Sequence, residues 1–171
     1  MKKRVGALVA ITGAVSTAIV AFPQSAAAQT DASPYGFSVQ VSLSPKALQK
    51  LTTLSESVAV NSFYYGKSAT KPTRADIKRA HAEGREPDQI EMAGDLVTLP
   101  AAGGVAGLPG RNLDATEVAA VGSNPLRVNV NVFSARKAAQ DNLLDCDLFE
   151  DELQLARAKP VIIGCRLIGE R

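Results

Sequence analysis

The chain has 171 residues, of which 46% are hydrophobic and 21% are charged, and its formal net charge is +2 at pH 7. This length is that of one globular domain, with enough apolar residues to bury a core. There is no tryptophan and only 5% of the residues are aromatic, so the core must consist mainly of Val, Leu and Ile. The small net charge excludes the strong basic field that favours nucleic-acid binding.

Residues 1–28 have the three parts of a secretory signal peptide. Lysines and an arginine at 2–4 form a basic start, and 5–22 is an apolar run without a charged residue. The alanines at 26–28 form the Ala-x-Ala pattern that signal peptidase recognises. We expect this leader to be cleaved and the protein to reach the periplasm or to be secreted. The alternative is an uncleaved membrane anchor.

The expected mature chain, 29–171, is nearly neutral. The full sequence has 19 Lys and Arg residues against 17 Asp and Glu residues, and the leader removes three basic residues and no acidic one. We therefore expect no nucleic-acid partner. No cysteine lies near residue 28 to accept a lipid, so we expect no stable membrane anchor after cleavage. We predict a single β-rich globular domain over 29–171, with residues 29–36 disordered.

The sequence contains two cysteines, Cys146 and Cys165. In an oxidising compartment, two cysteines without others favour one disulfide bond. The bond would close a loop of about twenty residues and stabilise the fold by roughly 3 kcal/mol. The alternative is two buried thiols that never meet. No Cys-x-x-Cys spacing is present, so the predicted role is structural rather than redox catalysis.

Alternation of apolar and polar residues predicts strands that have one face in water. This pattern is clear in three segments, at 37–43, 126–132 and 161–168. Residues 57–65 are rich in β-formers and apolar on both faces, so we expect a central or covered strand there. Two shorter strands are predicted at 90–92 and 96–99.

Capping residues predict short helices between the strands. The four expected helices are one after Ser44, one at 74–83 between Thr73 and Gly84, one from Asp114 to Gly122, and one from Asp147 to Ala158. Antiparallel strands joined by short helices predict a mainly β fold, an antiparallel β-sandwich with short connecting helices. The alternative is an α+β fold on a single antiparallel sheet.

Four glycines and two prolines lie within 100–110, which predicts a mobile surface loop. Arg111 and Asn112 follow Gly110, in place of the Lys and Ser or Thr of a phosphate-binding loop. This segment is therefore interpreted as a flexible loop and not as a nucleotide site.

Six acidic residues lie within 141–152. Oxygen ligands on a short segment are typical of calcium sites, so Asp141, Asp145 and Asp147 are the candidate Ca²⁺ ligands. The spacing does not match an EF-hand, and the alternative is that these acids begin a helix and face water. Apart from this cation, no cofactor is expected. A hydrolase that uses two of these carboxylates is the alternative function.

An excess of basic residues lies within 67–85. The candidate interaction surface consists of Lys71, Arg74, Lys78, Arg79 and Arg85. Such a surface would attract an envelope protein, an anionic envelope polymer or the acidic segment of another copy. The alternative is a solvated helix without a partner.

His81 is the only histidine, which excludes a histidine-rich zinc site and disfavours a serine triad. The sequence offers no paired nucleophile and base, and no cofactor cradle. The predicted function is an exported, non-enzymatic β-sandwich module that binds a protein or another envelope component. A small periplasmic hydrolase is the alternative.

Overall fold

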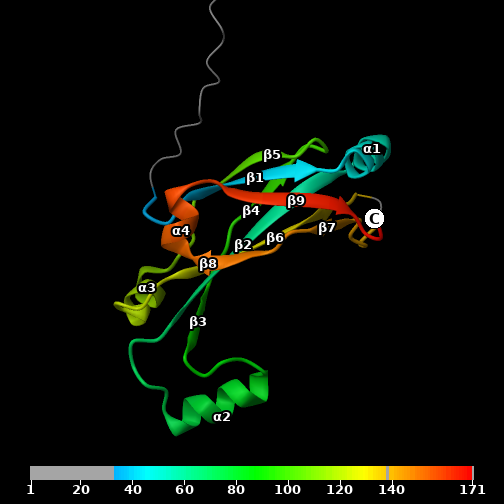
Figure 1. The fold of residues 1–171 in the computed structure, drawn as a ribbon. Coiled ribbons are helices and arrows are strands. Elements are labelled where there is room, and N and C mark those ends of the chain that lie inside the picture. Colours follow the sequence, from blue (N-terminus) through cyan, green and yellow to red (C-terminus); the bar gives the residue numbers. More distant parts are fainter. Residues whose placement is uncertain (1–32, 138, 171) are drawn as a thin grey trace, which may run out of the picture.

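The computed structural model describes residues 33–137 and 139–170. The expected signal peptide at 1–28 and the first residues of the expected mature chain, 29–32, lie outside this range. Two β-sheets pack face to face, and an arm carrying one helix projects from them (Figure 1). The predicted mainly β fold with short connecting helices is confirmed, and the presence of two sheets excludes the single-sheet alternative.

One sheet has four strands in the order β5–β1–β9–β7. Their bounds are Gly104–Leu108 for β5, Phe37–Leu43 for β1, Val161–Leu167 for β9 and Leu144–Cys146 for β7. β1 and β9 run parallel, whereas the other described pairings in the molecule are antiparallel. The chain must therefore cross the sandwich between its first and last described strands.

The other sheet has five strands, with β2 and β6 at its centre. The bounds are Ser57–Lys67 for β2, Gln89–Met92 for β3, Leu96–Leu99 for β4, Arg127–Ala135 for β6 and Phe149–Glu152 for β8. β3 and β4 pair with one edge of β2, β6 pairs with the other edge, and β8 follows β6. The strands predicted from alternation are all present.

Four helices are described: α1 (Pro45–Leu54), α2 (Arg74–Glu83), α3 (Ala115–Val121) and α4 (Leu153–Ala158). The predicted caps hold the first three. The Ser44 hydroxyl accepts a hydrogen bond from the Ala47 amide, Thr73 and Asp76 form a reciprocal capping box, and Asp114 accepts from two amides of α3. Each side chain satisfies amides that a helix start leaves unpaired.

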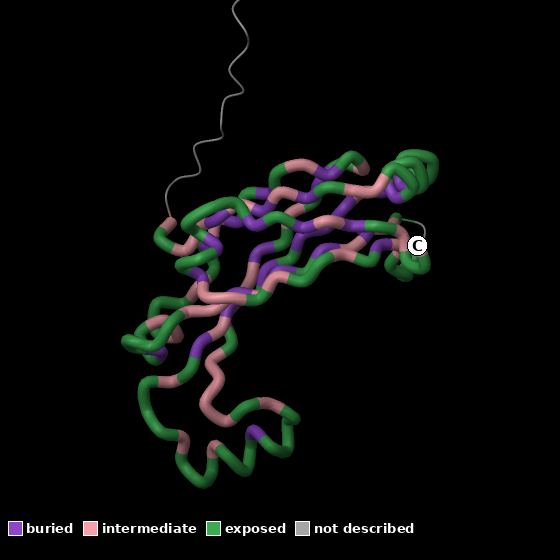
Figure 2. The backbone as a smooth tube through the Cα atoms, viewed as in Figure 1, coloured by how far each residue is buried: buried purple, intermediate pink, exposed green. Residues whose placement is uncertain are grey.

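The core lies between the two sheets, where the inward side chains of the strands form one hydrophobic cluster. Figure 2 shows buried positions along the strands of both sheets. In β1 the buried residues are Phe37, Val39 and Val41, as the alternation predicts. Valines dominate the facing sheet: Val58 and Val60 of β2 and three valines of β6 are almost fully buried. β-branched side chains pack well on pleated sheets, which explains how a core can form without tryptophan.

The helix predicted from Asp147 to Ala158 is wrong over its first half. Phe149–Glu152 is strand β8, and helix α4 begins only at Leu153. β8 pairs with β6, and Phe149 lies opposite Val130 and packs against the core. Pairing of this segment with the edge of β6 outweighs its helix-capping pattern. The free energy gained by tertiary packing is larger than the difference between local helix and strand propensities.

The mobile loop predicted at 100–110 is also wrong. Gly104–Leu108 is strand β5, which pairs with β1, and its residues Ala106 and Leu108 are buried. Gly103 and Gly104 have φ values of 73° and 125°, which only glycine adopts readily. The glycines therefore make the turn that allows this strand to enter the sheet.

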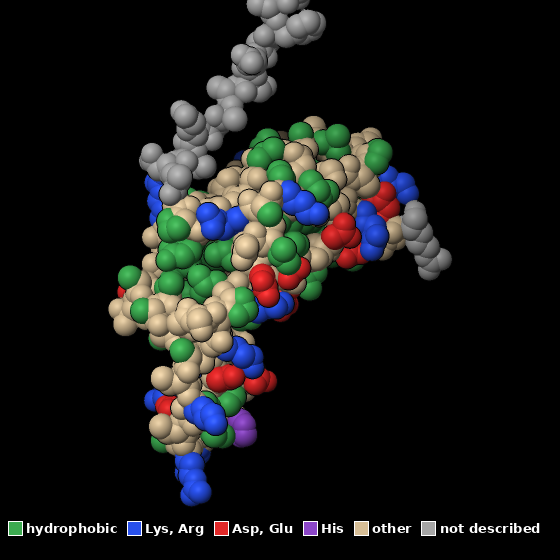
Figure 3. Space-filling view, turned by 60° about the vertical axis from the view of Figure 1, so that its left-hand side comes forward, with side chains coloured by type: hydrophobic (Ala, Val, Ile, Leu, Met, Phe, Trp, Pro, Cys, Tyr) green, Lys and Arg blue, Asp and Glu red, His purple; other side chains and the backbone are tan. Residues whose placement is uncertain are grey.

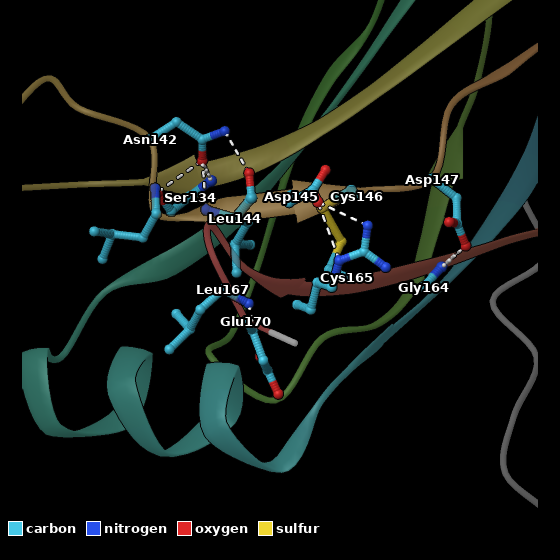
Figure 4. Close-up of a disulfide and its surroundings, with 12 residues drawn as sticks. Ser134, Asn142, Leu144, Asp145, Cys146, Asp147, Gly164, Cys165, Leu167 and Glu170 are labelled. Carbon is cyan, nitrogen blue, oxygen red and sulfur yellow. Dashed lines mark hydrogen bonds and ion pairs between the residues drawn. A yellow bond between two sulfur atoms is a disulfide. The ribbon is translucent and has the colours of Figure 1, made fainter.

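The predicted disulfide between Cys146 and Cys165 is present (Figure 4). The two cysteines lie directly opposite each other on β7 and β9, with their Cα atoms 4.0 Å apart. The bond fastens β7, a three-residue edge strand, to β9 of the same sheet. Within the described residues, no helix is long and apolar enough to cross a membrane.

The segment between β2 and β3 leaves the sandwich and carries α2 at its far end (Figure 1). We call residues 67–88 the α2 arm. Most of the arm is exposed (Figure 2), and Ala80 is the only buried residue of its helix. The remaining helices lie at the ends of the sandwich (Figure 1) and pack on its strands, whereas α2 packs closely on none of the described strands.

Candidate binding surfaces

The basic residues of the predicted interaction surface all lie on the α2 arm, whose end carries basic side chains in Figure 3. Two of these residues are paired within the arm. Arg79 Nη2 lies 2.6 Å from Asp76 Oδ1, and Arg85 Nε lies 2.6 Å from Glu83 Oε2. Both pairs are largely exposed, so they contribute little to stability. They do, however, reduce the charge that these two arginines offer to a partner.

The other three basic residues, Lys71, Arg74 and Lys78, have no such partner. Their side chains are exposed and form no hydrogen bond or ion pair with any residue that the structure describes. Arg74 and Lys78 are four residues apart on α2 and therefore lie on the same side of the helix. We call these three residues the cationic triad.

Asp141, Asp145 and Asp147, the candidate calcium ligands, are each held by a different partner. Asp141 pairs with Arg136. Asp145 Oδ2 lies 2.8 Å from Arg166 Nη2. Asp147 Oδ2 accepts a 3.1 Å hydrogen bond from the Gly164 amide (Figure 4).

None of these three contacts joins one carboxylate to another. Over residues 33–137 and 139–170, no group of three or more His, Cys, Asp and Glu side chains could hold a metal ion. Calcium binding and the carboxylate hydrolase both remain predictions from the sequence, and no contact of this segment favours either.

A second surface, which the sequence did not identify, lies on the outer face of the five-stranded sheet. The Tyr65 hydroxyl donates a 2.5 Å hydrogen bond to Glu150 Oε1 and accepts a 3.0 Å hydrogen bond from Arg127 Nε. The Arg127 guanidinium also lies 5.9 Å from the centre of the Tyr65 ring, within the range of a cation–π contact. Three strands thus meet at one tyrosine.

Ionisation of the two acidic groups follows from these contacts. The hydrogen bond from Tyr65 lowers the pKa of Glu150, and burial together with the bond to Glu150 raises the pKa of Tyr65. At neutral pH Glu150 is therefore a carboxylate and Tyr65 a neutral phenol. This assignment agrees with Tyr65 as the hydrogen-bond donor.

Phe63 extends this surface along β2. Its ring lies nearly parallel to that of Tyr65, with the centroids 6.2 Å apart, and 37% of the residue is exposed. Asn129 lies opposite Phe63 across the β2–β6 pair, and Asn61 lies opposite Asn131. The sequence places both asparagines of β6 on a wet face, but only the register shows that they surround an aromatic ring.

A hollow of about 410 Å³ lies at one end of the sandwich, between α3, α4 and the start of the described chain. Its lining residues include Tyr35, Val121, Leu153 and Arg157. Its volume is in the range of small-molecule sites. We assign this hollow no ligand.

No protein-family model, no curated protein and no solved structure matches this chain. Any function must therefore be inferred from the surfaces themselves.

Proposed function

We propose that this chain is an exported, non-enzymatic binding module that attaches to an anionic component of the envelope through the α2 arm. The observation that carries the proposal is the cationic triad, Lys71, Arg74 and Lys78. These side chains extend from a projecting arm and have no partner among the described residues. An anionic surface or polymer would supply the missing counter-charges.

The positions of the triad residues destabilise helix α2 in the absence of a partner. Arg74 lies at the start of α2, where the helix dipole favours an acidic residue and not a basic one. Arg74 and Lys78 are like charges at a spacing of four, which is also destabilising. Folding alone gives no reason for this arrangement, whereas contact with an anion would relieve both unfavourable terms.

The helix of the arm has little else to stabilise it. α2 has ten residues and buries only Ala80, and helices shorter than about 12–15 residues are marginal in water without packing. A partner that covers the exposed side of α2 would add the missing packing, including contact with Ile77, which is 37% exposed.

Export rests on the leader at 1–28 and is supported by the Cys146–Cys165 disulfide. Disulfides form and persist in oxidising compartments such as the periplasm or the extracellular space. The envelope is then the first source of anionic partners that the mature chain would meet.

The test is charge reversal of the triad, Lys71→Glu, Arg74→Glu and Lys78→Glu, followed by co-sedimentation of the purified protein with an envelope fraction. Each basic residue near an anionic surface contributes about 1 kcal/mol, so the reversal should weaken binding by at least about a hundredfold. Binding of the native protein should also fall as salt is added, because salt screens exposed charges.

The matched control reverses Lys50, Arg157 and Lys159. These two lysines and one arginine lie on the sandwich, are exposed and likewise form no ion pair with a described residue. The control carries the same change in net charge and should keep most of the binding. Equal losses in the two variants, or no loss in the triad variant, would show that the arm is not the contact.

A further inference from the structure

The outer face of the five-stranded sheet carries an exposed phenylalanine surrounded by asparagines. We define the Asn–Phe cluster as Asn61, Phe63, Asn129 and Asn131. From its chemistry we infer that this cluster is a second binding site, independent of the α2 arm, and that its ligand is a neutral saccharide.

The register of β2 and β6 brings the cluster together. Phe63 pairs with Asn129 and Asn61 pairs with Asn131, so each pair has Cβ atoms about 4.5–5.5 Å apart on the same face. Asn61 also precedes Phe63 by two residues on β2 and therefore points to the same side. The phenyl ring thus has an amide opposite it, one beside it and one diagonal to it.

The amides have hydrogen-bonding capacity to offer. Each asparagine carries one acceptor oxygen and a donor NH₂ group. Asn129 Nδ2 makes one long contact, 3.4 Å, to Glu150 Oε2. The side chains of Asn61 and Asn131 make no hydrogen bond within the described part of the chain. Both donors and acceptors therefore face outward around the ring.

The charged residues next to the cluster are both bonded to Tyr65. Arg127 and Glu150 both bond to the Tyr65 hydroxyl, so the two charges at the border of the cluster are of opposite sign and share one partner. The cluster itself contains no charged residue. A charged ligand would find no unpaired counter-charge in it, which favours an uncharged ligand.

Tyr65 also gives the cluster a rigid border. Its hydroxyl is held on two sides, and its ring lies beside that of Phe63. A group that is already fixed loses little conformational entropy on binding, and aromatic side chains provide large contact area at low entropic cost. The ring of Phe63 is therefore presented in a prepared position.

Saccharides match this combination of groups. A sugar ring has a face of C–H groups that packs on the face of an aromatic ring. The face of the aromatic ring has a partial negative charge, although the ring is neutral overall. Its hydroxyl groups both donate and accept hydrogen bonds, as carboxamides do. The cluster lies on the outer face of a sheet, which suits a ligand that lies flat, such as a segment of a glycan chain.

The experiment is an NMR titration of the full mature chain with neutral tetrasaccharides of glucose and of N-acetylglucosamine. We expect the side-chain amide signals of Asn61, Asn129 and Asn131 to shift on addition of at least one sugar. Phe63→Ala should weaken binding about tenfold or more, as expected for removal of an aromatic anchor. High salt should leave the affinity unchanged, because the site is neutral.

Ile162→Ala is the matched control, since Ile162 is an exposed apolar residue, 68% accessible, on the four-stranded sheet. It should leave sugar binding unchanged, and so should reversal of the cationic triad. Thermal unfolding of Phe63→Ala checks that the variant folds. Asn131→Ala, which removes only an exposed amide, should weaken binding severalfold and tests the same site with less risk to the fold.

The saccharide assignment is overturned if neither sugar shifts the three amides, or if Phe63→Ala and Ile162→Ala lose binding equally. It is also overturned if tetraglycine shifts the amides and the sugars do not, because the cluster would then bind a peptide. Failure here leaves the arm proposal standing, since that proposal depends on salt and on the triad and not on Phe63.

Discussion

Tyr64 and Tyr65 are neighbours on β2 and point to opposite faces of the five-stranded sheet. Each hydroxyl donates a hydrogen bond to a carboxylate: Tyr64 to Asp95 Oδ2 at 2.9 Å, and Tyr65 to Glu150 Oε1 at 2.5 Å. The first pair is buried inside the sandwich, whereas the second lies at the surface. The same chemical pair can therefore hold a fold together on one face and prepare a binding surface on the other.

The inner pair is part of a buried network. Asp95 Oδ2 also accepts a 2.8 Å hydrogen bond from the Gly110 amide, and the Asp95 amide donates to the Ser62 hydroxyl at 2.9 Å. The network joins β2 to the segment before β4 and to the segment after β5. Buried polar groups are costly to leave unpaired, so each member depends on the others.

The largest effect is expected from Asp95→Ala. It leaves the Tyr64 hydroxyl and the Gly110 amide without their acceptor, at about 1–3 kcal/mol for each buried group. We expect the free energy of unfolding to fall by roughly 4 kcal/mol in urea denaturation. Glu150→Ala, the outer counterpart, should cost less than about 1 kcal/mol, because exposed pairs contribute little. Similar losses in the two variants would mean that the faces do not differ.

The stabilisation from the disulfide can be compared with that from the inner network. The double variant Cys146→Ala and Cys165→Ala should lower the free energy of unfolding by about 3 kcal/mol, mainly because the unfolded chain gains freedom. The bond lies on the four-stranded sheet, away from both tyrosines. The losses in this variant and in Asp95→Ala should therefore add within about 0.5 kcal/mol. A clear departure from additivity would show that the Asp95 network and the disulfide are coupled.

Local patterns predicted most of the elements and the basic residues of the α2 arm, but not the Asn–Phe cluster. The alternation in β1 and the caps at Ser44 and Thr73 act within a few residues, so the sequence shows them directly. The sequence analysis missed β5, β7 and β8, because their strand character depends on pairing with β1, β9 and β6, which are distant in the sequence. Partners of this kind are set by tertiary packing.

The same difference separates the two candidate sites. The arm was predicted because its basic residues lie close together between Lys67 and Arg85. The Asn–Phe cluster was missed because Phe63 and Asn129 are joined only by the strand register. A period-two pattern assigns each residue to a face, but it does not say which residues of another strand lie beside it.

The pH dependence of stability should distinguish the two tyrosines. Burial raises the pKa of Tyr64 well above its usual value, so above pH 10 the unfolded chain loses a proton that the folded chain keeps. Stability from this group is therefore complete below about pH 10 and falls by about 1.4 kcal/mol for each further pH unit. Denaturation measured across this range should show a steeper slope in the native protein than in Tyr64→Phe, where only the raised pKa of Tyr65 still contributes. An equal slope in the two proteins would contradict this assignment.

The smallest change in stability is expected for Tyr65→Phe. The variant keeps the ring beside Phe63 and removes only an exposed hydroxyl, so the free energy of unfolding should change by no more than about 0.5 kcal/mol. Glu150 and Arg127 lose their common partner, and the border of the Asn–Phe cluster becomes less rigid. Affinity for a neutral tetrasaccharide should then fall severalfold while the fold is unaffected. A binding role predicts a loss of affinity without a loss of folding stability. If Tyr65→Phe instead destabilises the protein as much as Tyr64→Phe does, the outer hydrogen bonds stabilise the fold and do not serve binding.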